Sequence, residues 1–179
     1  MAYISVQEGL HGIRGLLAFR PETAKGIGLL TQELLQTDTG ISKGEREIIA
    51  AYVSTLNNCF YCATSHAAIA KYHCNEDEAF VQKAINDPQN SDLSPKMKAL
   101  MEIAKQVQQH GQNVKQHHID TARSAGATAC AGALVTIIRW MGDLLRMCVL
   151  STTDGGPAAA LALGACTRTC STTAPCGSF

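Results

Sequence analysis

The chain has 179 residues, of which 46% are hydrophobic, and its 15 basic and 15 acidic residues give a formal net charge of zero. This length and composition predict a globular domain with a sizeable core, and the balanced charge without a basic stripe argues against nucleic-acid binding. The sequence shows neither a signal-peptide layout nor an uncharged apolar run of membrane-spanning length, so we expect a cytoplasmic protein with no membrane partner.

Long segments with apolar residues at three- and four-residue intervals predict an all-α bundle with short connections. We expect residues 1–20 to be an irregular lead-in that allows a short turn of helix, and a proline fits the first position of a helix over 21–36. Ser42 followed by Glu45 is a capping-box pattern, which predicts a second helix over 44–56.

Polar residues and prolines set the later helix boundaries. Asn58 is the expected N-cap of a helix that carries two cysteines, and Asn75 is the expected start of another helix that ends before Pro88. A Ser-Pro pair opens a helix over 95–109, and one more helix is expected over 114–125.

The C-terminal part differs in composition from the rest. We expect one helical domain over residues 1–150, ending in a helix whose apolar face includes Leu134, Ile137 and Ile138. Residues 151–179 hold two charges and three cysteines among small residues, a composition that favours neither a core nor a solvated helix.

One stretch of the sequence combines redox-capable sulfur with proton carriers. Cys59 and Cys62 stand three residues apart, His66 follows four residues after Cys62, and Glu47 precedes Cys59 by twelve residues. On one helix, these spacings place both thiols and the imidazole on the same face. Glu47 reaches that face only if its helix packs alongside or the chain bends between the helices.

The residue types in this stretch suit redox chemistry. A thiolate is the nucleophile in peroxide attack and in disulfide exchange, and the N-terminus of a helix stabilises it. His66 can exchange protons near neutral pH, and Glu47 is a candidate to orient it or to relay its proton. In a cytoplasmic chain, eight cysteines are better explained by a catalytic pair than by a disulfide framework.

Two other interpretations compete for the same residues. Two cysteines on a helix can be small buried side chains that pack like hydrophobic residues. Alternatively, Cys59, Cys62 and His66 are three zinc ligands, with His73 or Cys74 as the fourth. A thioredoxin-type motif requires a preceding β-strand, and no such pattern precedes Cys59.

A family resemblance rests on this stretch. The pattern E-x11-C-x-x-C-x-x-x-H, preceded by S-x-x-E in an all-helical context, resembles the alkylhydroperoxidase D (AhpD-like) branch of the carboxymuconolactone decarboxylase family. The segments ISVQEGLHGIRGLLAFRPETAKGI and GEREIIAAYVSTLNNCFYCATSHAAIA are similar to its peroxidase-related members. The resemblance implies an AhpD-like helical bundle that acts as an antioxidant thiol peroxidase of the peroxiredoxin type.

The resemblance also implies roles for individual residues. Cys62 attacks hydrogen peroxide or a small organic hydroperoxide and becomes a sulfenic acid, and Cys59 supplies a proton and closes the Cys59–Cys62 disulfide. Glu47 and His66 match the proton-relay positions. Tyr61 stands where the best-known members have a histidine, and a phenol with a usual pKa of about 10 cannot replace an imidazole as a base at neutral pH.

The implied partners follow from the same resemblance. No cofactor is expected beyond the redox-active disulfide, which an external thiol or lipoyl-type reductant restores. Such folds pair their active-site helices across subunits, which implies a homo-oligomer. The alternatives are a decarboxylase of the carboxymuconolactone type, which needs no cysteine pair, and a redox-sensing or zinc-binding module without turnover.

The resemblance ends at about Ala127. We expect that the reading frame has shifted near codon 128, so that the final residues are foreign to the family. The alternative is a genuine divergent tail that binds metal through Cys166, Cys170 and Cys176.

Overall fold

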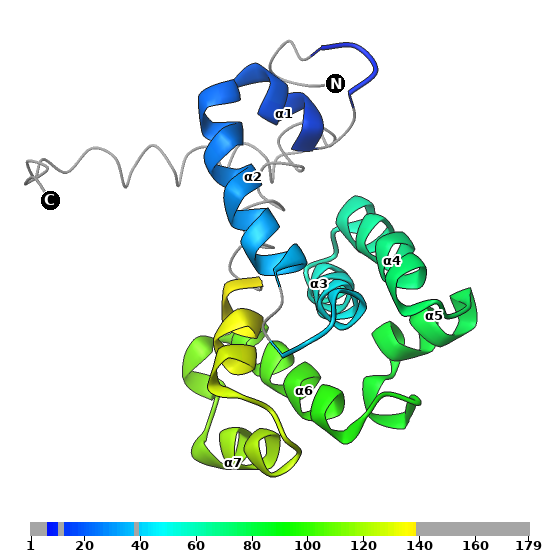
Figure 1. Ribbon diagram of the computed structural model, residues 1–179, viewed down its shortest axis with the longest axis vertical. Coiled ribbons are helices and arrows are strands. Elements are labelled where there is room, and N and C mark those ends of the chain that lie inside the picture. Colours follow the sequence, from blue (N-terminus) through cyan, green and yellow to red (C-terminus); the bar gives the residue numbers. More distant parts are fainter. Residues whose placement is uncertain (1–6, 11–12, 38–39, 139–179) are drawn as a thin grey trace, which may run out of the picture. The chain divides into compact units, whose positions relative to one another are not determined.

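A computed structural model describes residues 7–10, 13–37 and 40–138, and all regular secondary structure in these ranges is helical. The predicted all-α fold class is therefore confirmed for the described part of the chain. Figure 1 shows the elements, which are α1 Ile13–Phe19, α2 Pro21–Gln36, α3 Lys43–Leu56, α4 Phe60–Cys74, α5 Glu78–Asn86, η1 Pro88–Asn90, α6 Pro95–Gln109, η2 Gly111–Asn113, α7 Gln116–Ser124 and a helical segment over 129–138.

The chain divides after Arg20 into two compact units, and α1 belongs to the first of them. The second unit runs from Pro21 to Arg146 and holds the other described helices. Within it, α3 is the central element, because it packs against α2, α4, α5 and α6 (Figure 1). Buried apolar residues such as Ile48 and Ile49 lie on α3, and each fully buried side chain of this size stabilises the fold by about 1.5–3 kcal/mol.

The boundaries of α3 and α6 confirm the sequence predictions. Ser42 Oγ accepts a hydrogen bond from the Glu45 backbone N–H at 3.2 Å, and Glu45 Oε2 accepts one from the Ser42 N–H at 2.7 Å. These two bonds complete the capping box. At the start of α6, Ser94 Oγ accepts a hydrogen bond from the Met97 N–H at 3.2 Å.

The two asparagines predicted as N-caps, Asn58 and Asn75, have a different backbone conformation from the one an N-cap requires. Asn58 and Asn75 both have a φ of 55°, in the left-handed region, so neither is the N-cap of the helix that follows. Cys59 is the N-cap of α4 instead, and Asp77 is the N-cap of α5, where its Oδ1 accepts a hydrogen bond from the Phe80 N–H at 2.8 Å. Asparagine suits the left-handed conformation as well as the N-cap position, and here it reverses the chain between helices.

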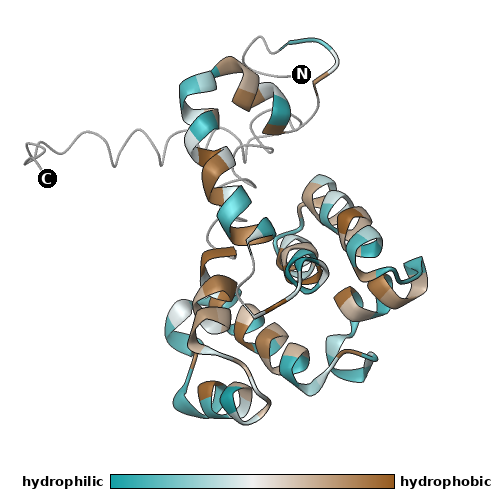
Figure 2. Ribbon diagram, viewed as in Figure 1, coloured by the Kyte–Doolittle hydropathy of each residue, from teal (hydrophilic) through white to brown (hydrophobic). Residues whose placement is uncertain are grey.

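The helical segment over 129–138 contributes to the same core. Leu134, Val135 and Ile138 are buried with residues of α3 and α6, whereas Ile137, predicted on the apolar face, is 40% exposed. Both hydrophobic and hydrophilic residues occur on the helices of this unit, as amphipathic packing requires (Figure 2). The proposed frame shift and the boundary at residue 150 concern residues that lie mostly outside the described ranges, so both stay predictions.

Gly44, in the first turn of α3, lies against the last residue of α4. A Cβ atom built on Gly44 would overlap Cys74 Sγ and would lie 3.0 Å from the Cys74 backbone nitrogen. Because backbone atoms cannot move aside as a flexible side chain can, the two helices approach this closely only without a side chain at position 44. The glycine therefore fixes the distance between α3 and α4 at one end of their contact.

No described helix combines the length and the apolar character needed to cross a membrane. The cytoplasmic location stays a prediction.

We predict that Gly44→Ala lowers the free energy of unfolding by about 1–3 kcal/mol, because the new methyl group forces α3 and α4 apart. Chemical denaturation followed by circular dichroism measures this change. Gly28→Ala on α2 is the matched control, since its new methyl group meets nothing within 4 Å and should instead stabilise the helix slightly. Equal effects of the two substitutions would contradict the tight contact at Gly44.

Candidate active site

Three residues join α3 to α4 and set the position of Cys59. Asn57 caps α3 with helical angles, Asn58 turns the chain through its positive φ, and the Cys59 N–H donates a 2.9 Å hydrogen bond to the Ser54 carbonyl. Cys59 itself has an extended backbone, with φ −97° and ψ 90°. It therefore stands immediately before α4 rather than in its first turn, where the sequence had placed it.

Cys62 is the third residue of α4, and its thiol lies beside that of Cys59. Both side chains are buried, and the two cysteines are not joined by a disulfide. Burial, followed by a side-chain hydrogen bond with Cys59 and the electrostatic effect of that neighbouring thiol, raises the pKa of Cys62 to about 12. The sequence predicts a thiolate stabilised by the helix N-terminus at Cys59, and this stays a prediction.

Glu47 and His66 form a hydrogen-bonded pair between the two helices. His66 Nδ1 lies 2.7 Å from Glu47 Oε2, and the Glu47 side chain is only 1% exposed, against 18% for His66. When Glu47 is ionised its carboxylate only accepts, so a neutral His66 donates through Nδ1–H and keeps its ring lone pair on Nε2. The sequence left open whether Glu47 reaches the face of His66, and the packing of α3 on α4 brings it there.

Tyr61 lies between Phe60 and Cys62 in the first turn of α4 and is half-buried. Among the described residues, nothing forms a hydrogen bond with its hydroxyl group. The structure thus brings Cys59 to Cys62 and Glu47 to His66, while the Tyr61 hydroxyl is joined to neither pair.

A cleft of about 380 Å³ opens beside Cys59, between the end of α3, the start of α4 and one face of α5. Cys59 and Phe60 line one side, and Gln82, Ile85 and Asn86 of α5 line another. The sequence analysis did not select the α5 residues. Their spacing indicated a shared helix face, but only the packing of α5 on α3 and α4 shows that this face meets Cys59.

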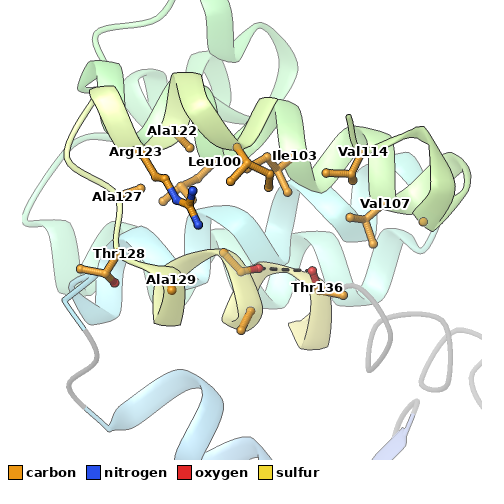
Figure 3. A pocket seen from close by; sticks show the side chains of 14 residues that line it. Leu100, Ile103, Val107, Val114, Ala122, Arg123, Ala127, Thr128, Ala129 and Thr136 are labelled. Carbon is orange, nitrogen blue, oxygen red and sulfur yellow. Dashed lines mark hydrogen bonds between the residues drawn. The ribbon is translucent and has the colours of Figure 1, made fainter. Parts of the chain in front are cut away.

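A second cleft lies between α6, α7 and the segment 129–138, and Figure 3 shows its lining. Its walls are mainly aliphatic, with Leu100, Ile103, Val107 and Val114 on one side and the Arg123 side chain reaching into it. None of its lining residues is a cysteine or a histidine. Of these two clefts, only the first is lined by a cysteine of the pair.

The ligand set required for zinc does not assemble in the part of the chain that the structure describes. There, no three His, Cys, Asp or Glu side chains are grouped so that they could hold a metal ion. The proposed fourth ligands, His73 and Cys74, lie at the opposite end of α4 from Cys59. The packing of Cys74 against Gly44 and the core explains its position instead.

Comparisons with known proteins agree with this arrangement. The model of the carboxymuconolactone decarboxylase family matches residues 21–79, which include α2, α3, the thiol pair and α4. No curated protein matches the sequence.

Two solved structures share the fold. One is the alkylhydroperoxidase AhpD core of an uncharacterized peroxidase-related protein from Ralstonia eutropha JMP134, with a TM-score of 0.69 and 24% identity over 75% of this chain and 70% of that one. The other is an uncharacterized peroxidase-related protein from Silicibacter sp. TM1040, with a TM-score of 0.67 and 21% identity over 75% of this chain and 72% of that one. The predicted AhpD-like helical fold is thus confirmed.

We predict that alkylation of Cys62 by iodoacetamide is slow at pH 8 and accelerates by about tenfold per pH unit above it, because only the thiolate reacts. Replacing Cys59 by alanine removes the hydrogen bond and the charge that help to raise the pKa of Cys62. In Cys59→Ala, alkylation should therefore reach its half-maximal rate at a lower pH. Peptide mass spectrometry measures the modification at each cysteine.

Cys74 provides an internal control in the same experiment. Its pKa is raised by burial, and then by the charges of Glu45 and Glu76, none of which involves Cys59. Its alkylation profile should be the same in both proteins. An unchanged profile of Cys62 in Cys59→Ala would show that the two thiols do not interact.

Proposed function

We propose that this protein is a thiol-dependent peroxidase, because residues 21–79 match the model of the carboxymuconolactone decarboxylase family and the chain has the AhpD-like fold. It reduces hydrogen peroxide or small organic hydroperoxides through Cys62 and Cys59. The observation that carries the proposal is the combination of two adjoining thiols with the buried Glu47–His66 hydrogen bond on the same pair of helices.

The raised pKa of Cys62 sets the first chemical requirement. At neutral pH this thiol holds its proton, so a base must accept that proton before the sulfur attacks. His66 lies one turn further along α4. Because Glu47 bonds to Nδ1 of His66, the Nε2 lone pair of that ring is available to accept the Cys62 proton. The Glu47 carboxylate then stabilises the imidazolium that forms.

The oxidation proceeds in two balanced steps. The Cys62 thiolate attacks one peroxide oxygen, the O–O bond breaks, and the leaving alkoxide or hydroxide takes up the proton, which leaves a sulfenic acid on Cys62. The Cys59 thiol then attacks the Cys62 sulfur, the S–S bond forms and water leaves. The contact between the two thiols supports this second step, because the resolving sulfur is already adjacent.

The remaining parts of the proposal concern partners. An external thiol or lipoyl-type reductant returns the disulfide to two thiols, and no cofactor takes part. We also propose a homo-oligomer, which is supported by large hydrophobic side chains exposed toward the end of α4, where Tyr72 is 82% and Ile69 is 40% exposed.

We predict that hydrogen peroxide removes two thiols per chain from the unmodified protein and that Cys62→Ser abolishes this loss. In Cys59→Ser, the disulfide cannot form, so a sulfenic acid should accumulate on Cys62 and react with dimedone. Thiol titration and mass spectrometry measure these outcomes, and Cys74→Ser is the control that should behave like the unmodified protein. Continued peroxide turnover by Cys62→Ser would overturn the proposal.

We predict that Glu47→Gln slows peroxide-dependent thiol oxidation at pH 7 by about 100-fold, because the neutral amide no longer stabilises the protonated His66. The deficit should shrink as the pH rises, since hydroxide then removes the proton from Cys62 directly. Stopped-flow measurement of thiol oxidation across pH gives both values. Glu76→Gln, an exposed change of the same kind, should have no effect. A uniform deficit at all pH values would point to a structural role alone.

The family description also favours a second candidate, a decarboxylase of the carboxymuconolactone type. That reaction relies on proton transfer and needs neither thiol. The cysteine variants distinguish the two, because a decarboxylase would keep its activity in Cys62→Ser and would lose it in Glu47→Gln.

A further inference from the structure

The cleft beside α4 is lined by only one of the two cysteines. Cys59 is among its lining residues and Cys62 is not. The reason is the position of each residue, because Cys59 precedes α4 with an extended backbone while Cys62 lies inside the first turn. Cys59 is therefore the cysteine of the pair that a molecule in the cleft contacts.

The described lining of this cleft is mainly apolar, and its polar side chains are uncharged. Its polar side chains are hydroxyls and amides, and its apolar part includes the exposed ring of Phe60. No Asp, Glu, Lys, Arg or His is among the residues that line it, which are Thr55, Asn58, Phe60, Gln82, Ile85 and Asn86 with Cys59 and three small residues of α4. A cleft of this kind offers hydrogen bonds and apolar contact but nothing that neutralises an ionic group.

Hydrogen bonds hold the amides on the α5 side in place. Asn86 Nδ2 donates to the Gln82 carbonyl at 2.9 Å and to Gln82 Oε1 at 3.3 Å. Gln82 Nε2 in turn donates to Glu78 Oε1 at 3.1 Å, and the Glu78 carboxylate is paired with Lys71 at 3.6 Å. The nearest charged group in this series of hydrogen bonds is therefore the Glu78 carboxylate, and its partner Lys71 does not line the cleft.

We propose that this cleft receives the thiol that reduces the Cys59–Cys62 disulfide, that the incoming sulfur attacks Cys59, and that the cleft selects thiols carrying no charge besides the reacting sulfur. The inference rests on the proposed function for the existence of that disulfide. It adds which sulfur is attacked and which chemical class of reductant is preferred.

The reduction balances in two exchanges. The incoming thiolate attacks Cys59 Sγ, the bond between Cys59 and Cys62 breaks, and Cys62 leaves and takes up a proton. A second thiol then attacks the reductant's sulfur in the mixed disulfide, which releases Cys59 as a thiol and the reductant as its own disulfide. His66, one turn from Cys62 on α4, is positioned to return the proton that Cys62 requires.

The experiment measures reduction without using peroxide. Diamide oxidises the purified full chain, and disulfide reduction is then followed with 2-mercaptoethanol, the anionic 2-mercaptoethanesulfonate and the cationic cysteamine, at rates corrected for each thiolate concentration. We expect 2-mercaptoethanol to react fastest. Acid quenching followed by peptide mass spectrometry should find the mixed disulfide on Cys59.

Two substitutions, one adding a negative and one a positive charge to the cleft, test whether the cleft selects reductants by their charge. Gln82→Glu should slow the anionic thiol by about threefold relative to 2-mercaptoethanol, and Asn86→Lys should accelerate it by a similar factor. Cysteamine should respond with the opposite sign. Gln112→Glu, the same substitution on exposed η2, is the matched control and should leave all three rates unchanged.

A mixed disulfide on Cys62 would overturn the inference, and so would rate ratios that Gln82→Glu and Asn86→Lys leave unchanged. Because diamide forms the disulfide, a protein that fails to reduce peroxide can still pass or fail this test. Failure of the proposed peroxidase activity and failure of the reductant site are therefore separate results.

Discussion

The hydrogen bond between Glu47 and His66 is the contact on which the candidate site depends. An isolated carboxylate is costly to bury, and Glu47 is almost completely buried in α3. The imidazole of His66 supplies the hydrogen bond that compensates this cost, and it does so from α4. The same bond therefore holds the two helices in register and leaves one ring nitrogen of His66 available for proton transfer.

The thiol pair complements this arrangement. Burial protects Cys62 from solvent but also keeps it protonated, so its chemistry depends on a neighbouring base. Cys59, the residue just before α4, lines the cleft, and Cys62 does not. In the proposed mechanism the two thiols have different roles, because Cys62 passes its proton to His66 and Cys59 reacts with the incoming thiol.

Much of the fold could be predicted from local signals. The capping box at Ser42 and the Ser94 N-cap gave helix starts that the hydrogen bonds confirm. The N-cap predictions for Asn58 and Asn75 are wrong, because both residues adopt the left-handed conformation. Asparagine favours both states locally, and the choice between them depends on how the flanking helices pack.

The sequence by itself determined the helical class, the spacing that groups the two cysteines with a histidine, and the candidate part of Glu47, because these follow from local periodicity and residue chemistry. Only the tertiary structure decided that Glu47 meets His66 and that α5 supplies an uncharged wall opposite Cys59. The raised pKa of Cys62 also depends on the tertiary structure, since burial and the contact with Cys59 arise when helices pack together. Such contacts join residues distant in the chain, which no local pattern records.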